Sequence, residues 1–221
     1  MDSARFSRDE LAFLIGVPLA WAVLLLFHPT GEGDAITYAD VQDEVTRFLV
    51  VHLGMLVFIP LMAGVVYLLV RGIEGTAARV CRIALVLFVV FYGAWEALVG
   101  IGTGILVNDI NGLAASDRAV AAPLVGEFND NILIRGFGVL VSIGSVAFIT
   151  AAIAAGVALH RHAGAPLGVT VLLALSGFLI TAHPPPFGPA GLALFIAAVL
   201  LLVRSQAARP APTRLAHPGP A

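Results

Sequence analysis

Long apolar stretches separated by short polar segments form the dominant pattern of this chain of 221 residues. An α-helix rises 1.5 Å per residue, so about 17–20 apolar residues cross a hydrocarbon core of about 30 Å. Stretches of this length occupy residues 11–27, 48–70, 83–107, 136–159, 165–182 and 187–203. The pattern predicts an all-α fold: a polytopic integral membrane bundle of six transmembrane helices, arranged as three hairpins in one domain over residues 1–204.

Polar segments mark the turns and the end of this domain. Pro184, Pro185 and Pro186 cannot continue a helix, so they predict a tight turn between the last two spans. Residues 114–122, in the loop after the third span, predict a short helix that lies on the membrane interface. The Pro-rich residues 205–221 predict a disordered cytoplasmic tail.

The basic residues predict the orientation of the bundle. All twelve are Arg, and nine of them fall on the side of the two termini, while Arg47, Arg118 and Arg135 fall on the other side. Because cytoplasmic loops carry the excess of positive charge, both termini are expected in the cytoplasm. A sequence without Lys is typical of GC-rich genomes, so the expected location is the plasma (inner) membrane of a bacterium, with several passes.

The composition supports a membrane protein and removes several classes of function. Hydrophobic residues make up 59% and charged residues 12% of the chain, about half of the roughly 25% charged residues usual in soluble domains. The lipid bilayer is therefore the expected partner. A net charge of −2 without a basic cluster predicts no nucleic-acid partner. The single Cys81 excludes an intrachain disulfide and a Cys-based metal cluster.

Glu96 is the acidic residue that lies deep inside a predicted span. A charge at the bilayer centre costs on the order of 3 kcal/mol or more, so such a residue is expected to face a cavity or a partner. Tyr92 and Thr103 share its helix face and are predicted to line a ligand pocket. The sequence predicts Glu96 as a proton carrier or general acid; a protonated Glu hydrogen-bonded to a neighbouring helix is the structural alternative.

His28, His52 and His183 come from three different predicted spans, yet the predicted topology brings all three to the outer membrane face. Imidazole is the commonest metal ligand, so the three rings could hold zinc, copper or iron, or two of them could clamp a haem. No local spacing such as H-x-x-x-H supports the site. A polar ring at a helix end also needs no ligand to explain it.

The predicted depths separate Glu96 from these histidines. Counted along the helices, Glu96 lies about 20 Å below the outer boundary at Asp109, and His52 about 8 Å below the boundary at Arg47. The gap of about 12 Å is too large for one coordination sphere; it shrinks to about 5 Å if the third helix leaves the membrane near Gly104. We therefore expect one pocket with two levels.

Three functions remain open on the sequence alone. The first is an outward-facing intramembrane pocket that binds a metal, a haem or a lipophilic small ligand, with redox or hydrolytic chemistry. The second is a proton-coupled transporter or channel that uses Glu96, and the third is a structural or assembly subunit. The sequence decides neither whether the protein is an enzyme nor whether it forms homo-oligomers.

Overall fold

The computed structural model describes residues 6–29 and 36–208, and this part of the chain is helical, without strands. The elements are α1 (Arg8–Leu25), α2 (Tyr38–Val41), α3 (Val45–Val70), α4 (Thr76–Trp95), the π-helix η1 (Glu96–Gly102), α5 (Thr103–Asn111), α6 (Ala115–Ala121), α7 (Pro123–Asn129), α8 (Val139–Ala163), α9 (Leu167–Thr181) and α10 (Phe187–Ala207). The predicted all-α bundle is confirmed.

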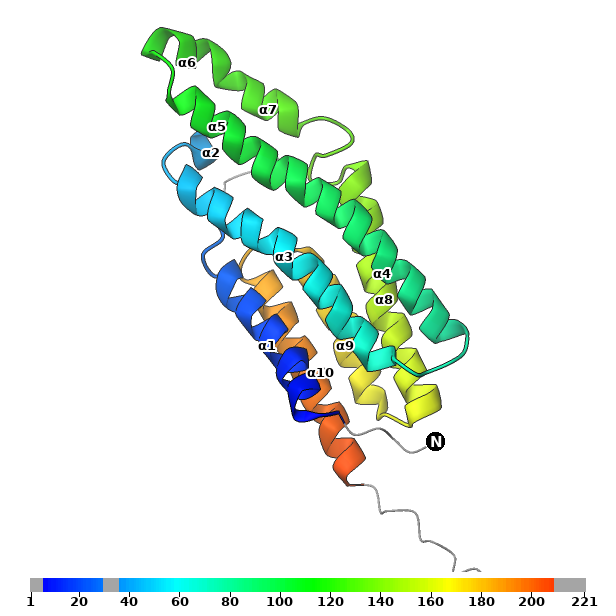
Figure 1. Cartoon of the computed structure of the whole chain (residues 1–221). Helices are drawn as coiled ribbons and strands as arrows, with labels where there is room; N and C mark the ends of the chain where they lie inside the picture. The colour runs from blue at the N-terminus through cyan, green and yellow to red at the C-terminus, as the bar shows by residue number, and fades with distance from the viewer. Residues whose placement is uncertain (1–5, 30–35, 209–221) are drawn as a thin grey trace, which may run out of the picture.

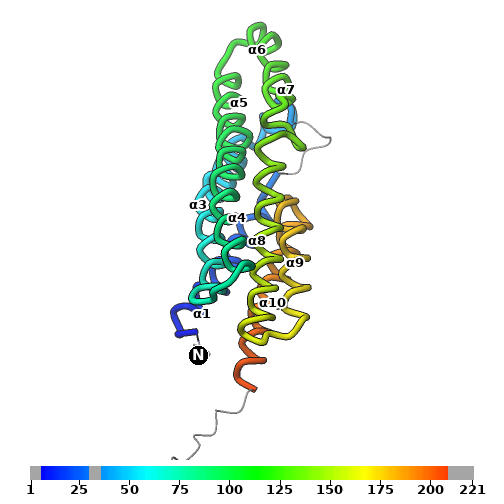
Figure 2. Tube along the Cα trace, turned by 90° about the vertical axis from the view of Figure 1, so that its right-hand side faces the viewer, coloured from blue at the N-terminus to red at the C-terminus, as the bar shows by residue number. Residues whose placement is uncertain are grey.

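The long helices lie side by side in an elongated bundle (Figure 1). Going round the bundle, α1 packs on α3, α3 on α4, α4 on α8, α8 on α9 and α9 on α10, and α10 closes the ring by packing on α1. The two described ends of the chain lie at the same end of the bundle, and α5, α6 and α7 project from the opposite end (Figures 1 and 2). The ring brings the first and last long helices together, which matters for the site below.

Helices occupy all six predicted stretches, but they differ in how well they suit a membrane. Four continuous segments are long and apolar enough to cross one: Val45–Val70, Thr76–Asn111, Val139–Ala163 and Phe187–Ala207. Helix α9 is apolar but has only 15 residues, and α1 has 18 residues with Arg8, Asp9 and Glu10 in its first turn. The described residues therefore support a multi-pass membrane protein, with four helices meeting the full requirement.

Large apolar side chains cover the outside of the bundle. Val57 of α3, Val86 of α4, Val146 of α8 and Phe178 of α9 are each more than half exposed. Exposed apolar side chains on several neighbouring helices are unfavourable in water and mark a surface that contacts another apolar phase. Lipid contact explains why these faces carry so little charge.

The third predicted span is longer than its hydropathy indicates. Helices α4, η1 and α5 form one continuous segment of 36 residues from Thr76 to Asn111, and the short helices α6 and α7 run back along α5 (Figure 2). The last helix also continues to Ala207, beyond the predicted start of the tail; residues 209–221 lie outside the described part of the chain. The extension of the third span changes the depth assigned to Glu96.

Helices α4 and α8 approach closely at Gly144. A Cβ added at Gly144 would lie 2.7 Å from the backbone nitrogen of Tyr92, which is closer than van der Waals contact. The space beside Gly93 on α4 is open, because a Cβ added there would meet no heavy atom within 4 Å. Gly144 therefore sets the separation of the two helices and the position of Tyr92.

We predict that Gly144→Ala destabilises the bundle while Gly93→Ala does not. Both changes raise helix propensity equally, so the difference reports the clash with α4, which should cost about 1–3 kcal/mol. Thermal unfolding in detergent micelles, followed by circular dichroism, measures both variants. Equal midpoints for the two variants would contradict close packing at Gly144.

Candidate metal site

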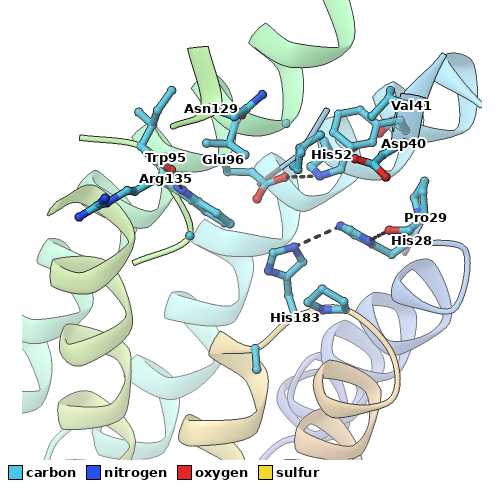
Figure 3. Close-up of a pocket in the computed structure, with 18 of the residues that line it drawn as sticks. His28, Pro29, Asp40, Val41, His52, Trp95, Glu96, Asn129, Arg135 and His183 are labelled. Atoms are coloured by element: carbon cyan, nitrogen blue, oxygen red, sulfur yellow. Dashed lines mark hydrogen bonds and ion pairs between the residues drawn. The ribbon is translucent and has the colours of Figure 1, made fainter. Parts of the chain in front are cut away.

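Three histidines from different parts of the chain point toward one another beside the cavity (Figure 3). His28 follows the end of α1, His52 lies in the second turn of α3, and His183 lies in the turn between α9 and α10. One ligand nitrogen from each ring lies within 4.8 Å of those of the other two. The packing of α1 against both α3 and α10 produces this convergence.

Local structure explains where two of the rings sit. The amide of His28 still bonds to the Leu25 carbonyl (3.0 Å), and Pro29 then prevents the helix from continuing. His183 is followed by three prolines, so the chain must turn at this point before α10 begins. Helix ends and turns lie at the end of the bundle, and the rings of these two residues therefore reach the same place.

The Nδ1 atoms of His28 and His52 are bonded to backbone carbonyls. His28 Nδ1 lies 2.6 Å from the Pro29 oxygen, and His52 Nδ1 lies 2.7 Å from the Phe48 oxygen. A carbonyl only accepts, so each Nδ1 carries the proton and donates it. In a neutral ring the Nε2 atom then holds a lone pair and no hydrogen.

The third ring, His183, is linked to the others and to Tyr92. Its Nε2 lies 3.1 Å from His28 Nε2, and its Nδ1 lies 3.1 Å from the Tyr92 hydroxyl. Because His28 Nε2 has no hydrogen, His183 Nε2 is the donor of that contact and Tyr92 donates to His183 Nδ1.

The Tyr92 hydroxyl can also serve the other tautomer of His183. It lies 3.3 Å from the Thr181 carbonyl, to which it can donate. If the proton of His183 moves to Nδ1, that group can donate to the Tyr92 oxygen while Tyr92 donates to Thr181. In this second tautomer the Nε2 atoms of His183 and His28 both present lone pairs, so their 3.1 Å contact then lacks a hydrogen.

The environment favours neutral imidazoles. Burial lowers the pKa of His28, and the positive charge of Arg47 lowers it further, while the bond to the Pro29 carbonyl opposes the shift. Burial, followed by the neighbouring rings of His28 and His52, holds the pKa of His183 well below its usual range. Neutral imidazole is the form that binds a metal ion.

Glu96 faces the same cluster from the start of η1. Its side chain is fully buried, and neither carboxylate oxygen has a hydrogen-bond partner among the described residues. Oε1 lies 3.8 Å from His52 Nε2 (Figure 3), which is longer than a hydrogen bond. The Nε2 lone pair of His52 and the carboxyl group of Glu96 thus face each other without a hydrogen bond between them.

The predicted gap of about 12 Å between Glu96 and the histidines is wrong. That estimate assumed that the third helix reaches the outer membrane boundary at its end. The helix instead continues to Asn111, and its last part, α5, projects beyond the rest of the bundle (Figure 1). Glu96 therefore lies at the level of His52, as the shorter predicted separation allowed.

The contact between η1 and α3 depends on Gly100. A Cβ at Gly100 would collide with the His52 ring, and on its other side this ring packs on Phe48 with centroids 4.0 Å apart. The absence of a side chain at Gly100 therefore lets the ring fit between the two helices. The wider π-helical turn at this point is a feature found frequently at functional sites.

A cavity of about 490 Å³ opens beside the cluster, and most of its lining is apolar. The lining includes all three histidines and Glu96, together with polar Asp40, Asn129 and Arg135 and apolar Ile36, Val41, Phe48, Trp95, Val99, Ile134 and Phe187. Tyr92 and Thr103, predicted as pocket lining, are not among these residues. Tyr92 lies behind His183, to which its hydroxyl is bonded. The Thr103 hydroxyl donates to the side-chain oxygen of Asn129 (3.1 Å), and Asn129 does line the cavity.

Sequence reasoning missed the role of Trp95. Its Nε1 donates to the Ile134 carbonyl (2.6 Å), and its ring lies 5.6 Å from that of His183. Trp95 thus fixes the segment before α8 against the cavity. Its position directly before Glu96 in the sequence was the signal that could have indicated a place beside the cavity.

No protein-family model, curated protein or solved structure matches this chain.

Proposed function

We propose that this protein binds one divalent transition-metal ion of the zinc type through His28, His52 and His183. The observation that carries the proposal is the hydrogen bonding of the rings. Histidines that ligate metals almost always use their second nitrogen to donate to a carbonyl or a similar acceptor. His28 and His52 do so, and His183 has Tyr92 available for the same purpose. The other nitrogens are then left to face one another.

The distances between the rings suit one ion. Tetrahedral zinc with Zn–N bonds of about 2.0–2.1 Å places its ligand nitrogens about 3.3 Å apart. The Nε2 atoms of His28 and His183 are 3.1 Å apart, and the ligand atoms of all three rings lie within 4.8 Å. Small side-chain rotations are enough to bring the third ring into the same coordination sphere.

An ion fits these residues better than a haem. Two histidines that clamp a haem lie on opposite faces of the porphyrin with the iron between them. The 3.1 Å contact between His28 and His183 leaves no room for a porphyrin plane. Imidazole ligands suit zinc, copper, iron and nickel, and three of them with a free fourth position are typical of zinc enzymes.

The same observations favour a one-sided pocket over a channel. Phe88, Tyr92 and Phe148 are fully buried. The distance between ring centroids is 5.4 Å from Phe88 to Tyr92 and 4.5 Å from Phe88 to Phe148. This packed aromatic core lies on α4 and α8 next to the site and favours a pocket that is closed on this side. A purely structural bundle would gain nothing from placing the Glu96 carboxyl group beside the His52 Nε2 lone pair without a hydrogen bond, since each buried group costs desolvation.

We further propose that all six long helices cross the membrane with both termini in the cytoplasm. The closed ring of helices, the shared end for both described chain ends and the distribution of Arg support this topology. Helices α1 and α9 are short for a full span, but they lie within the ring between longer neighbours. In this orientation the cavity opens at the outer face of a bacterial inner membrane.

Purified protein should bind one zinc per chain. His52→Ala and His183→Ala should each weaken zinc binding by about 100-fold or more, because each removes a ligand. Tyr92→Phe should weaken it by about 10–100-fold, because this change removes a hydrogen bond that orients the His183 ring. Isothermal titration and metal analysis after chelator treatment measure these effects. His160→Ala is the matched control, since its Nδ1 is also bonded to a carbonyl (Ala165, 2.8 Å) but His160 belongs to no group of three metal-ligating side chains among the described residues. Equal zinc binding by His52→Ala and wild type would contradict the site.

Zinc affinity should change little between pH 8 and pH 6.5. Three imidazoles with the ordinary pKa of about 6.5 would each be half protonated at pH 6.5, and affinity would fall about eightfold. Since burial lowers the pKa values of His28 and His183, these rings bind fewer protons at pH 6.5 than ordinary imidazoles, and the expected loss is well below eightfold. Below the lowered pKa values protons compete and affinity falls steeply. Titrations at pH 8, 7, 6.5 and 5.5 test this, and an eightfold loss by pH 6.5 would show ordinary rings.

A further inference from the structure

We infer that the metal site is hydrolytic: water on the ion, with Glu96 as general base, cleaves an ester or amide bond of a lipophilic amphiphile held in the adjoining cavity. The inference rests on the proposed metal site and adds to it a reaction, a further residue and a class of substrate.

The first support is the number of protein ligands. Among the described residues, the group whose ligand atoms all lie within 4.8 Å of one another consists of the three histidines. Glu96 does not belong to this group. Zinc held by four protein ligands is structural, whereas zinc held by three keeps its fourth position for water or substrate. The cavity reaches all three rings, so this fourth position is accessible.

The second support is the carboxylate beside that position. Glu96 is fully buried, its two oxygens have no hydrogen-bond partner among the described residues, and Oε1 lies 3.8 Å from His52 Nε2. A structural Glu in a membrane helix would be hydrogen-bonded to a neighbouring helix, and no such bond joins Glu96 to another described helix. Water on an ion held by His52 would carry two hydrogens within reach of Glu96 and would supply the missing donor. A general base must lie within hydrogen-bond distance of the proton that it takes.

The third support is the size and character of the cavity. Its volume of about 490 Å³ greatly exceeds what an ion needs and falls within the range of small-molecule sites. Ile36, Val41, Val99 and Phe187 supply apolar walls, while the polar part of the lining comes from the histidines, Glu96, Asp40, Asn129 and Arg135. A substrate that fits has an apolar body along these walls and a carbonyl directed at the ion. A molecule of this kind dissolves in the bilayer that surrounds the bundle.

The reaction balances with water alone. As the oxygen of the water forms a bond to the carbonyl carbon, Glu96 takes one of its protons, and the ion holds the charge that develops on the carbonyl oxygen. The bond from carbon to the leaving oxygen or nitrogen then breaks, the carbonyl double bond re-forms, and Glu96 gives its proton to the leaving group. The products are a carboxylic acid and an alcohol or amine. Nothing is oxidised or reduced.

The test uses the full chain in detergent micelles, loaded with zinc, and measures both bound zinc and hydrolysis of 4-nitrophenyl octanoate and 4-nitrophenyl acetate. We expect zinc-dependent hydrolysis that favours the octanoate. Glu96→Gln should keep one zinc and lose about 100- to 10,000-fold in rate, as removal of a general base does. His52→Ala should lose zinc and rate together. Glu127→Gln, which changes an exposed carboxylate on α7, should match the wild type.

Each other outcome identifies which claim fails. Loss of zinc from a folded Glu96→Gln variant would make Glu96 a fourth ligand and the site structural, which overturns the hydrolytic inference and leaves the metal site intact. A zinc-loaded wild type that hydrolyses neither ester, or a Glu96→Gln variant at full rate, would overturn it as well. A wild type that binds no zinc would overturn the proposed function and this inference together.

A second measurement needs no variant and so does not depend on folding of the substituted chain. Octanohydroxamic acid combines a zinc-binding head with an apolar tail, and it should inhibit the wild type at least tenfold more strongly than acetohydroxamic acid, which has the same head. Equal inhibition by the two would show that the apolar cavity does not hold the substrate.

Discussion

The hydrogen bonds that hold the Nδ1 atoms of three clustered histidines determine the chemistry available at this end of the bundle. In apolar surroundings each polar group needs a partner, and the carbonyls of Pro29 and Phe48 and the hydroxyl of Tyr92 supply one for each ring. These bonds fix the orientation of the rings and place the protons of His28 and His52 on Nδ1. The Nε2 side of the cluster consequently carries lone pairs, and the carboxyl group of Glu96, which has no hydrogen-bond partner among the described residues, faces it. A cation on this side would be bound by these lone pairs.

The closed ring of helices makes this cluster possible. His28 and His183 are 155 residues apart in the chain and touch because α10 packs on α1. His52 joins them because Gly100 lets its ring enter the contact between α3 and η1. Two helix contacts, α10 with α1 and α3 with η1, thus bring the three ligands together. A shift of one helix would separate the set, and tight packing through Gly100 and Gly144 opposes such a shift.

The site combines a polar environment and an apolar one in the same helix bundle. Glu96 and three imidazoles form a compact polar end, and the cavity beside them has mostly apolar walls. Keeping polar groups at this depth is costly, and proteins retain such groups where they act on a ligand or a proton. Beyond the site, the aromatic contacts of Phe88 with Tyr92 and Phe148 close the core. Access is therefore from one end of the bundle.

The sequence by itself determined the helices and the residue types that could carry chemistry. Apolar length is a local property, so each of the six stretches predicted a helix at its correct place, and Glu96 and the three histidines stood out because polar groups are rare in such surroundings. The tertiary structure decided which of them meet. The distance from Glu96 to His52 depends on how far the helix from Thr76 to Asn111 extends and on its π-helical turn, and hydropathy reports neither. The part played by Tyr92 depends on the tautomer of a histidine 91 residues away. Hydropathy records which residues prefer lipid to water, but the rotation and the relative height of packed helices follow from side-chain contacts between them.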